Sequence, residues 1–479
     1  MDQNRTPLLD ALLGYQKKQR VSFHVPGHKD GIVFPKKGKD TFQKLLSIDS
    51  TELEGLDDLY QPQGPILEAQ NLLADYYQTG KSYFLVNGST VGNLTMILST
   101  CRAGDRVLVQ RNSHKSIFNA VQLSQTNPVF LSPVIDEETE LPVGITKKVV
   151  LEALDKYPDA KALILTYPNY YGMAAEDCQE VIETAKDKGL RVLVDEAHGA
   201  HFKLGQPVPE SSLTFGADIV VHSAHKTLPA MTMGSYLHIH RDARDLTDSV
   251  EKYLSMLQSS SPSYPIMASL DLARHYMASI PERMLQRILA HIKQLESQLQ
   301  EIPQIHVVTG EGYRYKRDPF KILLQSSSDV SGYMLQKRFM SYGIYPELAD
   351  PMHVLLILGI SDQLAYSTVP HIIKQALNDL PSRRRQPNGK KCMPEPMASL
   401  ALNYDQMQHL TSIHRPITEA ENGISAEDII PYPPGIPIVL KGERLTDRSI
   451  EMIQYWRHAG ARFQSGKAVQ EGKISVFDL

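Results

Sequence analysis

The chain has 479 residues, and its 50 lysines and arginines nearly balance its 54 aspartates and glutamates, giving a formal net charge of -4. This balance excludes a protein that binds nucleic acid through a large basic excess, and Cys101, Cys178 and Cys392 are too scattered for a disulfide framework or a cysteine-rich metal site. No apolar run is long enough to span a membrane, and the first twenty residues lack the apolar core of a secretory signal, so we expect a cytoplasmic globular enzyme.

Six short runs rich in β-forming residues occur in the first half of the chain and are predicted to be strands. They cover residues 81–88, 105–110, 127–133, 161–168, 191–198 and 218–225. Helical stretches such as residues 177–189 separate several of them, and strands that are apolar along their whole length are typical of sheets buried on both faces. The sequence therefore predicts an α/β fold with a mostly parallel sheet covered by helices.

The second half of the chain begins with a long amphipathic helix, expected at residues 281–301. This helix leads into a second, smaller α/β unit with strands predicted at residues 320–325 and 353–360, and the polar, basic residues 382–391 are expected to form a solvated linker. The pattern predicts an N-terminal segment at 1–60, a large domain at 61–300, a small α/β domain at 301–381 and a C-terminal domain at 392–479.

Polar residues cluster where four of the predicted strands end. "NGST" (87–90) follows the first strand and opens a helix, "RNSHKS" (111–116) follows the second, and "VLVDEAHGAH" (192–201) and "VVHSAHK" (220–226) end two later strands. In open α/β sheets, ligands collect beyond the carboxyl ends of the strands. Lys226 stands there before a largely uncharged run, although lysine side chains normally reach water. We therefore expect a site at this edge of the sheet.

Two kinds of site fit these residues. A metal held by Asp195, His198, His201 and His225 would make the protein a metal-dependent hydrolase. Pyridoxal phosphate would instead use Lys226 as its Schiff-base lysine, Asp195 as the partner of the pyridine nitrogen and "NGST" as an anion cradle. The second interpretation uses more of the residues, because a metal leaves the lysine and the cradle unexplained.

Several motifs in order resemble the Orn/Lys/Arg decarboxylases of fold type I, which use pyridoxal phosphate. They are "FHVPGHKDG", "LDDLYQPQGPILEAQ", "RNSHKS", "VDEAHGAHF", "SAHKTLPAMTMGSYLH", "SSSPSYPIMASLD" and "PYPPGIP". The resemblance covers nearly the whole chain and is strongest to the short bacterial branch of arginine and lysine decarboxylases. It implies a large domain that binds pyridoxal phosphate, followed by smaller α/β domains.

The resemblance also implies a role for each residue near the strand ends. Lys226 would carry the cofactor and later return a proton, and a largely apolar environment would help to keep its amine neutral. Asp195 would keep the pyridine nitrogen protonated, with Ala197 beneath the ring and His114 stacked on the opposite face. The phosphate would be bound by Gly88, Ser89, Thr90, Ser223 and His225, and by Ser259 and Ser261 contributed from a neighbouring subunit.

Residues that contact the substrate are harder to assign from the sequence. His198 stands where the large enzymes of the family have an aromatic residue, and it would either contact the substrate carboxylate or simply fill the site. A cationic substrate tail needs an acidic partner, for which Glu347, Asp57 and Asp58 are the candidates. A guanidinium group prefers a bidentate carboxylate, whereas an ammonium group needs only a point charge.

The expected function is the decarboxylation of a basic amino acid, most specifically L-arginine to agmatine, a polyamine precursor, and carbon dioxide. Lysine and ornithine remain alternative substrates, and the metal-dependent hydrolase is the alternative from another class. An aminotransferase is disfavoured because no arginine stands in a convincing context to hold an α-carboxylate, and a DNA-binding regulator because the first 60 residues offer no basic helix. We expect a homodimer or higher homo-oligomer with shared active sites and no nucleic-acid or membrane partner.

Overall fold

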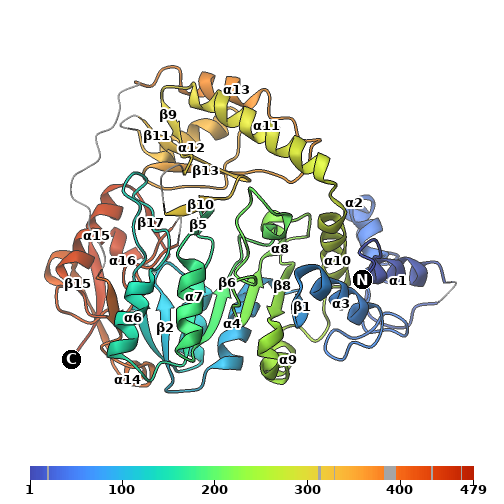
Figure 1. Cartoon of the computed structure of the whole chain (residues 1–479), viewed down its shortest axis with the longest axis horizontal. Helices are drawn as coiled ribbons and strands as arrows, with labels where there is room; N and C mark the ends of the chain where they lie inside the picture. Colours follow the sequence, from blue (N-terminus) through green and yellow to red (C-terminus); the bar gives the residue numbers. More distant parts are fainter. Residues whose placement is uncertain (19–20, 311–313, 328–329, 382–394, 433–434, 465–466) are drawn as a thin grey trace. The chain divides into compact units, whose positions relative to one another are not determined.

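The computed structural model of the protein describes residues 1–18, 21–310, 314–327, 330–381, 395–432, 435–464 and 467–479 (Figure 1). The chain forms two compact units, between which it passes several times. The first contains Met1–Thr100, Leu193–Leu204 and Glu210–Pro281, and the second contains Cys101–Val192, Gly205–Pro209 and Glu282–Leu479. Within the described residues, no helix is both long enough and apolar enough to cross a membrane.

The first unit is built on four sheet strands in the order β1-β8-β7-β6. They are β1 (Lys81–Leu85), β8 (Ser235–Ile239), β7 (Ile219–His222) and β6 (Arg191–Asp195), of which the last three residues belong to this unit. β7 runs parallel to β6, and β8 runs antiparallel to both β7 and β1. β1, β6 and β7 therefore run in one direction, so their carboxyl ends lie at the same edge.

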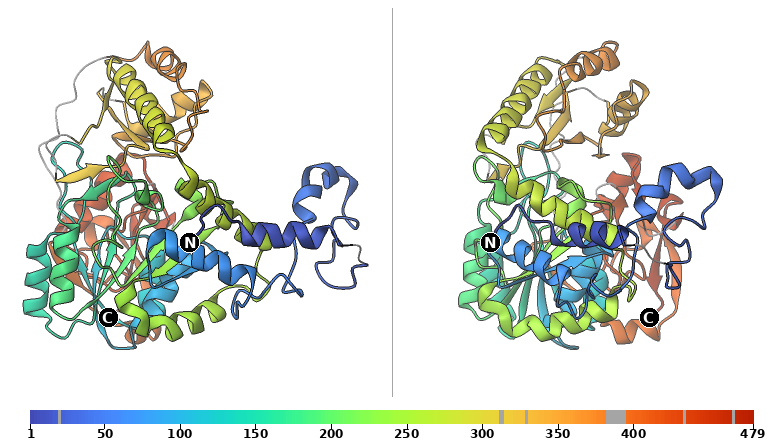
Figure 2. Two further views of the ribbon diagram at one scale, coloured as in Figure 1. Left: turned by 45° about the vertical axis from the view of Figure 1, so that its right-hand side comes forward. Right: turned by 90° about the vertical axis from the view of Figure 1, so that its right-hand side faces the viewer.

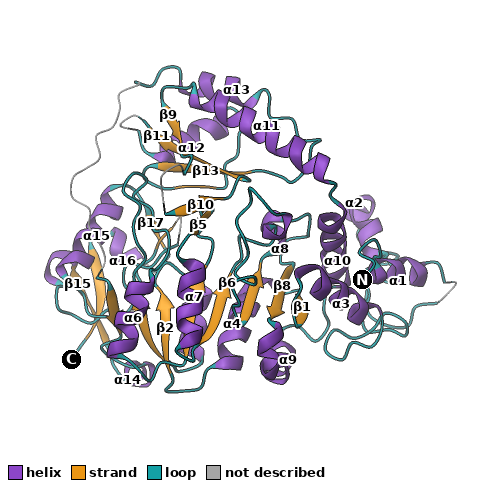
Figure 3. Ribbon diagram, in the orientation of Figure 1, coloured by secondary structure: helices purple, strands orange, loops and turns teal. Residues whose placement is uncertain are grey.

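Helices flank these strands (Figure 3), and one glycine allows a helix to pack closely against them. The helices of the unit are α1 (Pro7–Gln16), α2 (Lys36–Leu46), α3 (Pro65–Tyr77), α4 (Gly88–Thr100), α8 (Ala224–Thr227), α9 (Thr247–Leu257) and α10 (Tyr264–Ser279). α4 packs on β1, β7 and β8. A Cβ atom at Gly92 would lie 2.7 Å from Leu85 Cδ1 and 2.8 Å from Val221 Cγ1, so a larger residue would push α4 away from the strands.

The second unit contains four further sheet strands in the order β4-β2-β3-β14. They are β4 (Ala162–Thr166), β2 (Arg106–Gln110), β3 (Asn127–Leu131) and β14 (Met397–Ser399). β2 pairs in parallel with both β3 and β4, whereas β14 is antiparallel to β3. The helices of this part are α5 (Lys115–Leu123), α6 (Lys147–Lys156) and α7 (Cys178–Asp187). Three of the four strands in each unit thus share one direction, which confirms the predicted α/β class with mostly parallel strands.

A smaller antiparallel sheet in the second unit has the order β12-β13-β11-β9. Its strands are β9 (Ile305–Val307), β11 (Lys321–Ser326), β12 (Leu348–Ala349) and β13 (His353–Ile357), and its helices are α11 (Glu282–Gln300), α12 (Gly332–Ser341) and α13 (Val369–Leu377). Two short strands, β5 (Met173–Ala175) and β10 (Tyr315–Arg317), pair with each other.

The C-terminal part of the second unit has a core of its own, which includes Leu445, Ile453 and Val469. It contains β15 (Ser412–Pro416), β16 (Pro431–Tyr432), β17 (Arg462–Phe463), β18 (Lys473–Phe477), α14 (Tyr404–Gln408), α15 (Asp447–His458) and α16 (Lys467–Gln470). β15 pairs with β18 and β16 with β17, both antiparallel.

All the strands and both helices that the sequence analysis predicts by range are confirmed, and most of the strands end earlier than predicted. β6, for example, ends at Asp195 instead of residue 198, because the chain turns after Asp195. The sequence analysis missed β8, which lies within the uncharged run after Lys226. The expected linker at 382–391 lies outside the described residues, and the four-part division of the chain stays a prediction.

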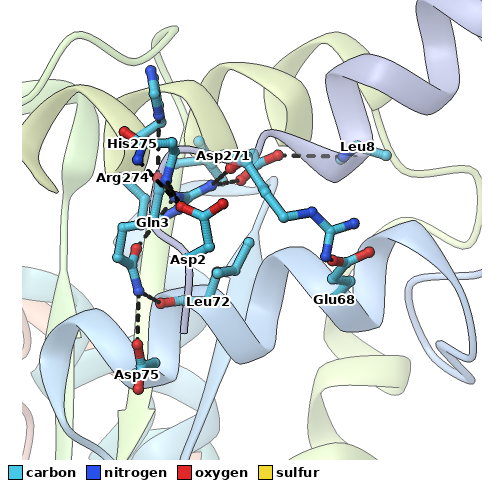
Figure 4. Close-up of polar contacts among 12 residues, drawn as sticks. Asp2, Gln3, Leu8, Glu68, Leu72, Asp75, Asp271, Arg274 and His275 are labelled. Carbon is cyan, nitrogen blue, oxygen red and sulfur yellow. Dashed lines mark hydrogen bonds and ion pairs between the residues drawn. The ribbon is translucent and has the colours of Figure 1, made fainter. Parts of the chain in front are cut away.

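The N-terminus is held by a buried ion pair on α10 (Figure 4). Asp271 and Arg274 are both fully buried, and the guanidinium also donates to the backbone oxygens of Gln3 and Arg5, each at 2.6 Å. The Asp271 carboxylate in turn accepts a hydrogen bond from the Leu8 amide at 3.3 Å. Burial raises the pKa of the Asp271 carboxyl, and the bonds from Arg274 oppose that rise. One buried pair thereby fixes the start of α1 on α10.

We predict that Arg274→Ala lowers the free energy of unfolding by about 3–5 kcal/mol, because it leaves the Asp271 charge buried without its partner. Arg5→Ala is a matched control, since Arg5 pairs with Glu68 through a side chain that is 58% exposed, and it should cost at most about 1 kcal/mol. Urea denaturation of both variants measures the difference. Equal losses would contradict the role assigned to the buried pair.

Candidate active site

Lys226 lies where the sequence analysis expects it, just beyond the carboxyl end of β7. It sits in the single turn of α8, and its Nζ is 3.1 Å from Nε2 of His198, which comes from the loop after β6. The side chain is only partly buried. The amine and the imidazole are therefore within hydrogen-bond distance of each other.

Asp195, at the end of β6, is almost completely buried and is oriented by two neutral donors. Asn93 Nδ2 of α4 donates to its Oδ2 at 2.7 Å, and the Ala197 amide donates to its Oδ1 at 3.1 Å. Among the described residues, no lysine or arginine forms an ion pair with this carboxylate. A buried carboxylate without a counter-charge is costly, so the site is suited to receive a cation such as a protonated pyridine ring.

An anion cradle lies at the start of α4, immediately after β1. Gly88 has a φ of +78°, a conformation that glycine adopts without strain, and a Cβ atom there would meet nothing within 4 Å. The turn therefore favours glycine at this position. Ser223 Oγ donates to Ser89 Oγ at 2.6 Å, which places two hydroxyls beside the first-turn amides that have no partner within a helix. Hydroxyls and amides at a helix start are suited to phosphate.

His225, the residue before Lys226, already forms a hydrogen bond within the fold. Its Nδ1 lies 3.0 Å from the Gly234 oxygen, and because a carbonyl only accepts, Nδ1 must carry the proton. Burial lowers the pKa of this imidazole, which disfavours the cationic form that would donate from Nε2 as well. A bound phosphate would oppose that shift, since a nearby anion favours the imidazolium.

A chain of buried hydrogen bonds connects Ser82 on β1 with Glu196, the residue after Asp195. It runs from Ser82 Oγ to His238 Nδ1 at 2.7 Å, from His238 Nε2 to His222 Nδ1 at 3.1 Å, and from His222 Nε2 to Glu196 Oε1 at 3.0 Å. Thr79 Oγ1 continues it beyond Ser82 at 2.7 Å. Because the carboxylate only accepts, His222 donates to it from Nε2. Burial, together with the neighbouring His222, holds the pKa of His238 well below its usual value, so the His238 ring is neutral.

The chain joins the two loops that carry the predicted site. Glu196 directly follows Asp195, and His222 lies four residues before Lys226, so their hydrogen bond ties one loop to the other. Ser211 Oγ and the Ser212 amide also donate to Glu196, at 2.6 and 2.7 Å. The sequence analysis assigned no role to Glu196 or His222, although both lie inside quoted motifs.

Two further residues near the site, His238 and Asn93, were also not predicted from the sequence. His238 lies on β8, which was not recognised as a strand. Asn93 lies five residues after Gly88, in the first turns of α4, where a polar side chain on a buried helix face was the available signal.

Two predicted residues lie in the second unit. His114 caps the start of α5, where its Nδ1 accepts from the Ser116 amide at 3.3 Å and lies 2.7 Å from Ser116 Oγ. Glu347 precedes β12 with an exposed side chain, and its amide donates to the Leu355 oxygen at 2.9 Å. Their roles toward a cofactor and a substrate stay predictions.

Asp57 has a structural role that does not involve a substrate. Its carboxylate accepts backbone hydrogen bonds from Gln63 at 2.8 Å and from Gly64 at 2.7 Å, and further bonds from the amides of Ile66 and Leu67 at the start of α3. It therefore anchors the N-terminal end of that helix. Asp58 is less engaged, since one of its oxygens accepts from the Tyr60 amide at 2.8 Å.

Ser259 and Ser261 are exposed and lie near the cradle of their own chain. The Ser259 amide donates to Asn87 Oδ1 at 3.2 Å, one residue before Gly88, and Tyr60 Oη donates to the Ser259 oxygen. Their contribution to the site of a neighbouring subunit stays a prediction.

The alternative of a metal site finds no support in the geometry. Asp195 bonds to Asn93 and Ala197, His198 to Lys226, and His225 to a carbonyl. His201 packs edge-on against Phe202. Across the part of the chain that the structure describes, no group of three histidine, cysteine or acidic side chains is arranged to hold a metal ion.

A lysine beside an imidazole, a buried carboxylate held by neutral donors and hydroxyls at a helix start are the kinds of group that an enzyme of the pyridoxal phosphate class uses. Comparison with known families agrees. Residues 6–313 match the major domain of Orn/Lys/Arg decarboxylase, and residues 385–465 match its C-terminal domain. The chain belongs to the Orn/Lys/Arg decarboxylase family, and it is a decarboxylase that uses pyridoxal phosphate.

Individual relatives cover almost the whole chain. The uncharacterized protein YaaO of Bacillus subtilis is 44% identical over 98% of this chain and 98% of its own length. An arginine decarboxylase of the same organism is 34% identical over 95% of this chain and 94% of its own length. The lysine decarboxylase LdcF of Francisella novicida has a similar structure, with a TM-score of 0.79 and 18% identity over 99% of this chain and 81% of that one. At that identity, the structural likeness supports the fold alone.

We predict that Glu196→Ala lowers the free energy of unfolding by about 3 kcal/mol or more, because several buried donors lose their acceptor at once and each costs about 1–3 kcal/mol. Glu210→Ala, an exposed acidic residue of the same unit, is the control and should change it by no more than about 0.5 kcal/mol. Chemical denaturation measures both. A loss below 1 kcal/mol in Glu196→Ala would rule out a rigid buried chain.

Proposed function

We propose that the protein converts L-arginine to agmatine and carbon dioxide. The observation that carries the choice of arginine is the arginine decarboxylase of Bacillus subtilis, which is 34% identical over nearly the full length of both chains. Decarboxylation of a basic amino acid is the activity of the family. Lysine is the second candidate, because lysine decarboxylases are also among the relatives, at 24% identity for LdcA of Pseudomonas aeruginosa.

Lys226 is the residue proposed to hold the cofactor covalently and to deliver a proton to the substrate Cα. When bound, pyridoxal phosphate supplies an electron sink that accepts the electron pair left when the carboxylate departs as carbon dioxide. The 3.1 Å contact between Lys226 Nζ and His198 Nε2 allows a proton to move between the two groups. The imidazole can take a proton as the amine becomes neutral and return it when the amine has to act as an acid.

Asp195 is proposed to keep the ring nitrogen protonated. Asn93 and the Ala197 amide orient its carboxylate but supply no positive charge, so its full charge acts on the ring. Ala197 leaves room for a flat ring because its side chain is a single methyl group. Ser89 and Ser223 hold the phosphate at the start of α4, together with Gly88 and Thr90.

The substrate tail is proposed to meet Glu347, with Asp58 as the second candidate. An exposed carboxylate can offer both oxygens to a guanidinium group, and such bidentate pairs are stronger than a contact with an ammonium group. Asp57 is the weakest of the three candidates, because backbone amides of α3 already occupy its oxygens.

We further propose that two copies of the chain form a homodimer in the cytoplasm and that its product enters polyamine synthesis. Residues 21–33 support the dimer, since they extend away from the strands of the first unit (Figure 2). They expose five large apolar residues, among them Val21 at 80%, Phe23 at 93% and Ile32 at 75%. Exposed apolar side chains gathered on one segment are typical of a surface that another chain covers.

Lys226→Ala should abolish both covalent attachment of the cofactor and turnover, because no other amine replaces the one at the end of β7. Borohydride reduction followed by peptide mapping should find the cofactor on residue 226 of the wild-type protein and on no peptide of the variant. Lys252→Ala, an exposed lysine in α9 of the same unit, should behave like the wild type. Covalent cofactor on another lysine, or turnover by Lys226→Ala, would overturn the assignment.

Parallel assays with L-arginine, L-lysine and L-ornithine test the proposed substrate. We expect kcat/KM for arginine to be higher than kcat/KM for lysine or ornithine by about tenfold or more.

Glu347→Gln should raise KM for arginine by about tenfold with little change in kcat. The reason is that a charge-assisted contact between the substrate tail and Glu347 is worth at least about 1.4 kcal/mol. Glu419→Gln, an exposed glutamate in the same unit, is the control. Faster turnover of lysine would replace arginine in the proposal, and an unchanged KM would remove Glu347 from the site.

A further inference from the structure

The turn between Lys226 and β8 contains a residue with a strained backbone. Met233 has a φ of +76°, a value that glycine adopts freely and a methionine adopts only with strain. The Gly234 amide donates to the Met231 oxygen at 2.9 Å, so these residues form a tight turn with Met233 in third place. Turns with a positive φ at the third residue usually have glycine there. Met233 is also 45% exposed, so burial of its side chain does little to offset the strain.

The glycine of this turn stands one position later, where packing requires it. A Cβ atom at Gly234 would lie 2.9 Å from Leu270 Cδ2 of α10 and 3.0 Å from the Met231 oxygen. The absence of a side chain therefore lets the turn lie close to α10. The chain uses this glycine for close packing, and the positive φ falls on the methionine before it.

The strained turn holds two parts of the candidate site through consecutive carbonyl groups. The Met233 oxygen accepts a hydrogen bond from the Gly88 amide at 2.9 Å, at the start of the cradle on α4. The Gly234 oxygen accepts from the His225 amide at 3.1 Å and lies 3.0 Å from His225 Nδ1, next to Lys226. Because the backbone angles at Met233 set the direction of both carbonyls, a change in its φ would disturb both contacts.

The segment that carries Lys226 therefore contacts the cradle at both of its ends. On one side of the lysine, Ser223 Oγ donates to Ser89 Oγ at 2.6 Å. On the other side, the Met233 oxygen satisfies the Gly88 amide, one of the amides that a helix leaves without a partner inside the helix at its start. A segment fixed at two points holds the lysine and the cradle in one arrangement.

We propose that Met233 is a positioning residue, whose left-handed backbone conformation fastens the segment that carries Lys226 to the cradle and thereby sets the affinity for the phosphate group of the cofactor. The proposal rests on the proposed assignment of the cradle to Gly88 and Ser89. Strained backbone conformations persist at sites that bind ligands, where the surrounding contacts impose them. A residue that resists this conformation loosens the cradle in the protein without cofactor, and binding of the phosphate then has to restore it.

Two substitutions at one position separate the backbone conformation from the side chain. Met233→Val should weaken the binding of pyridoxal phosphate by about tenfold, because a β-branched residue tolerates a positive φ poorly. Met233→Gly should bind within about twofold of the wild type, since glycine adopts this conformation freely. Met231→Val is the control, because Met231 lies in the same turn, is 39% exposed and has no positive φ, and it should bind like the wild type.

The full-length protein, freed of cofactor, is titrated with pyridoxal phosphate and with pyridoxal, which lacks the phosphate group, and the change in absorbance gives both dissociation constants. We expect Met233→Val to lower the preference for pyridoxal phosphate over pyridoxal by about tenfold and to leave the affinity for pyridoxal unchanged. A general structural defect would weaken both ligands alike and would contradict the proposal.

An unchanged preference in Met233→Val, or a loss in Met233→Gly as large as that in Met233→Val, would also overturn the proposal. If Met233→Val does not fold, Met233→Gly decides, because a lost preference in that variant would show that the side chain is needed and not the backbone conformation. A wild-type protein without preference for pyridoxal phosphate would refute the cradle itself. The other outcomes leave the proposed decarboxylation standing, since turnover is not measured.

Discussion

The common direction of β1, β6 and β7 is the constraint on which the candidate active site depends. Strands that run in one direction deliver their carboxyl ends to one edge, so Gly88, Asp195 and Lys226 come from distant parts of the sequence to the same region. The bond of 3.0 Å between His222 Nε2 and Glu196 Oε1 then ties two of these ends together. Because both side chains are fully buried, water cannot replace either partner.

Charge pairing separates the residues that hold the fold from those available for chemistry. Asp271 with Arg274 and Arg111 with Glu443 are closed pairs, in which each charge meets its opposite. Asp195 differs, because neutral groups orient it and its charge remains for a cation to balance. A buried carboxylate oriented only by neutral donors is costly until a cation balances it, and on this the proposed role of Asp195 toward the pyridine nitrogen rests.

The C-terminal motif has a structural meaning that its resemblance to a family does not supply. Pro431, Ile436 and Pro437 of "PYPPGIP" form part of the wall of a cavity whose other sides come from the residues after β2 and from the turn before β13. These three segments are far apart in the sequence and meet only in the folded chain. No single motif therefore describes the cavity.

The sequence by itself determined the α/β class, six of the eight strands in the two mostly parallel sets and the positions of Lys226, Asp195 and Gly88 at the ends of strands. These features are local: apolar runs of strand length, and polar residues at the points where such runs end. The tertiary structure alone decided which neighbours surround them. The Asn93 bond to Asp195 and the chain of hydrogen bonds from Thr79 to Glu196 both join residues that lie on separate elements or loops. Side chains that are far apart in the sequence interact only after the strands have paired, so no motif contains that information.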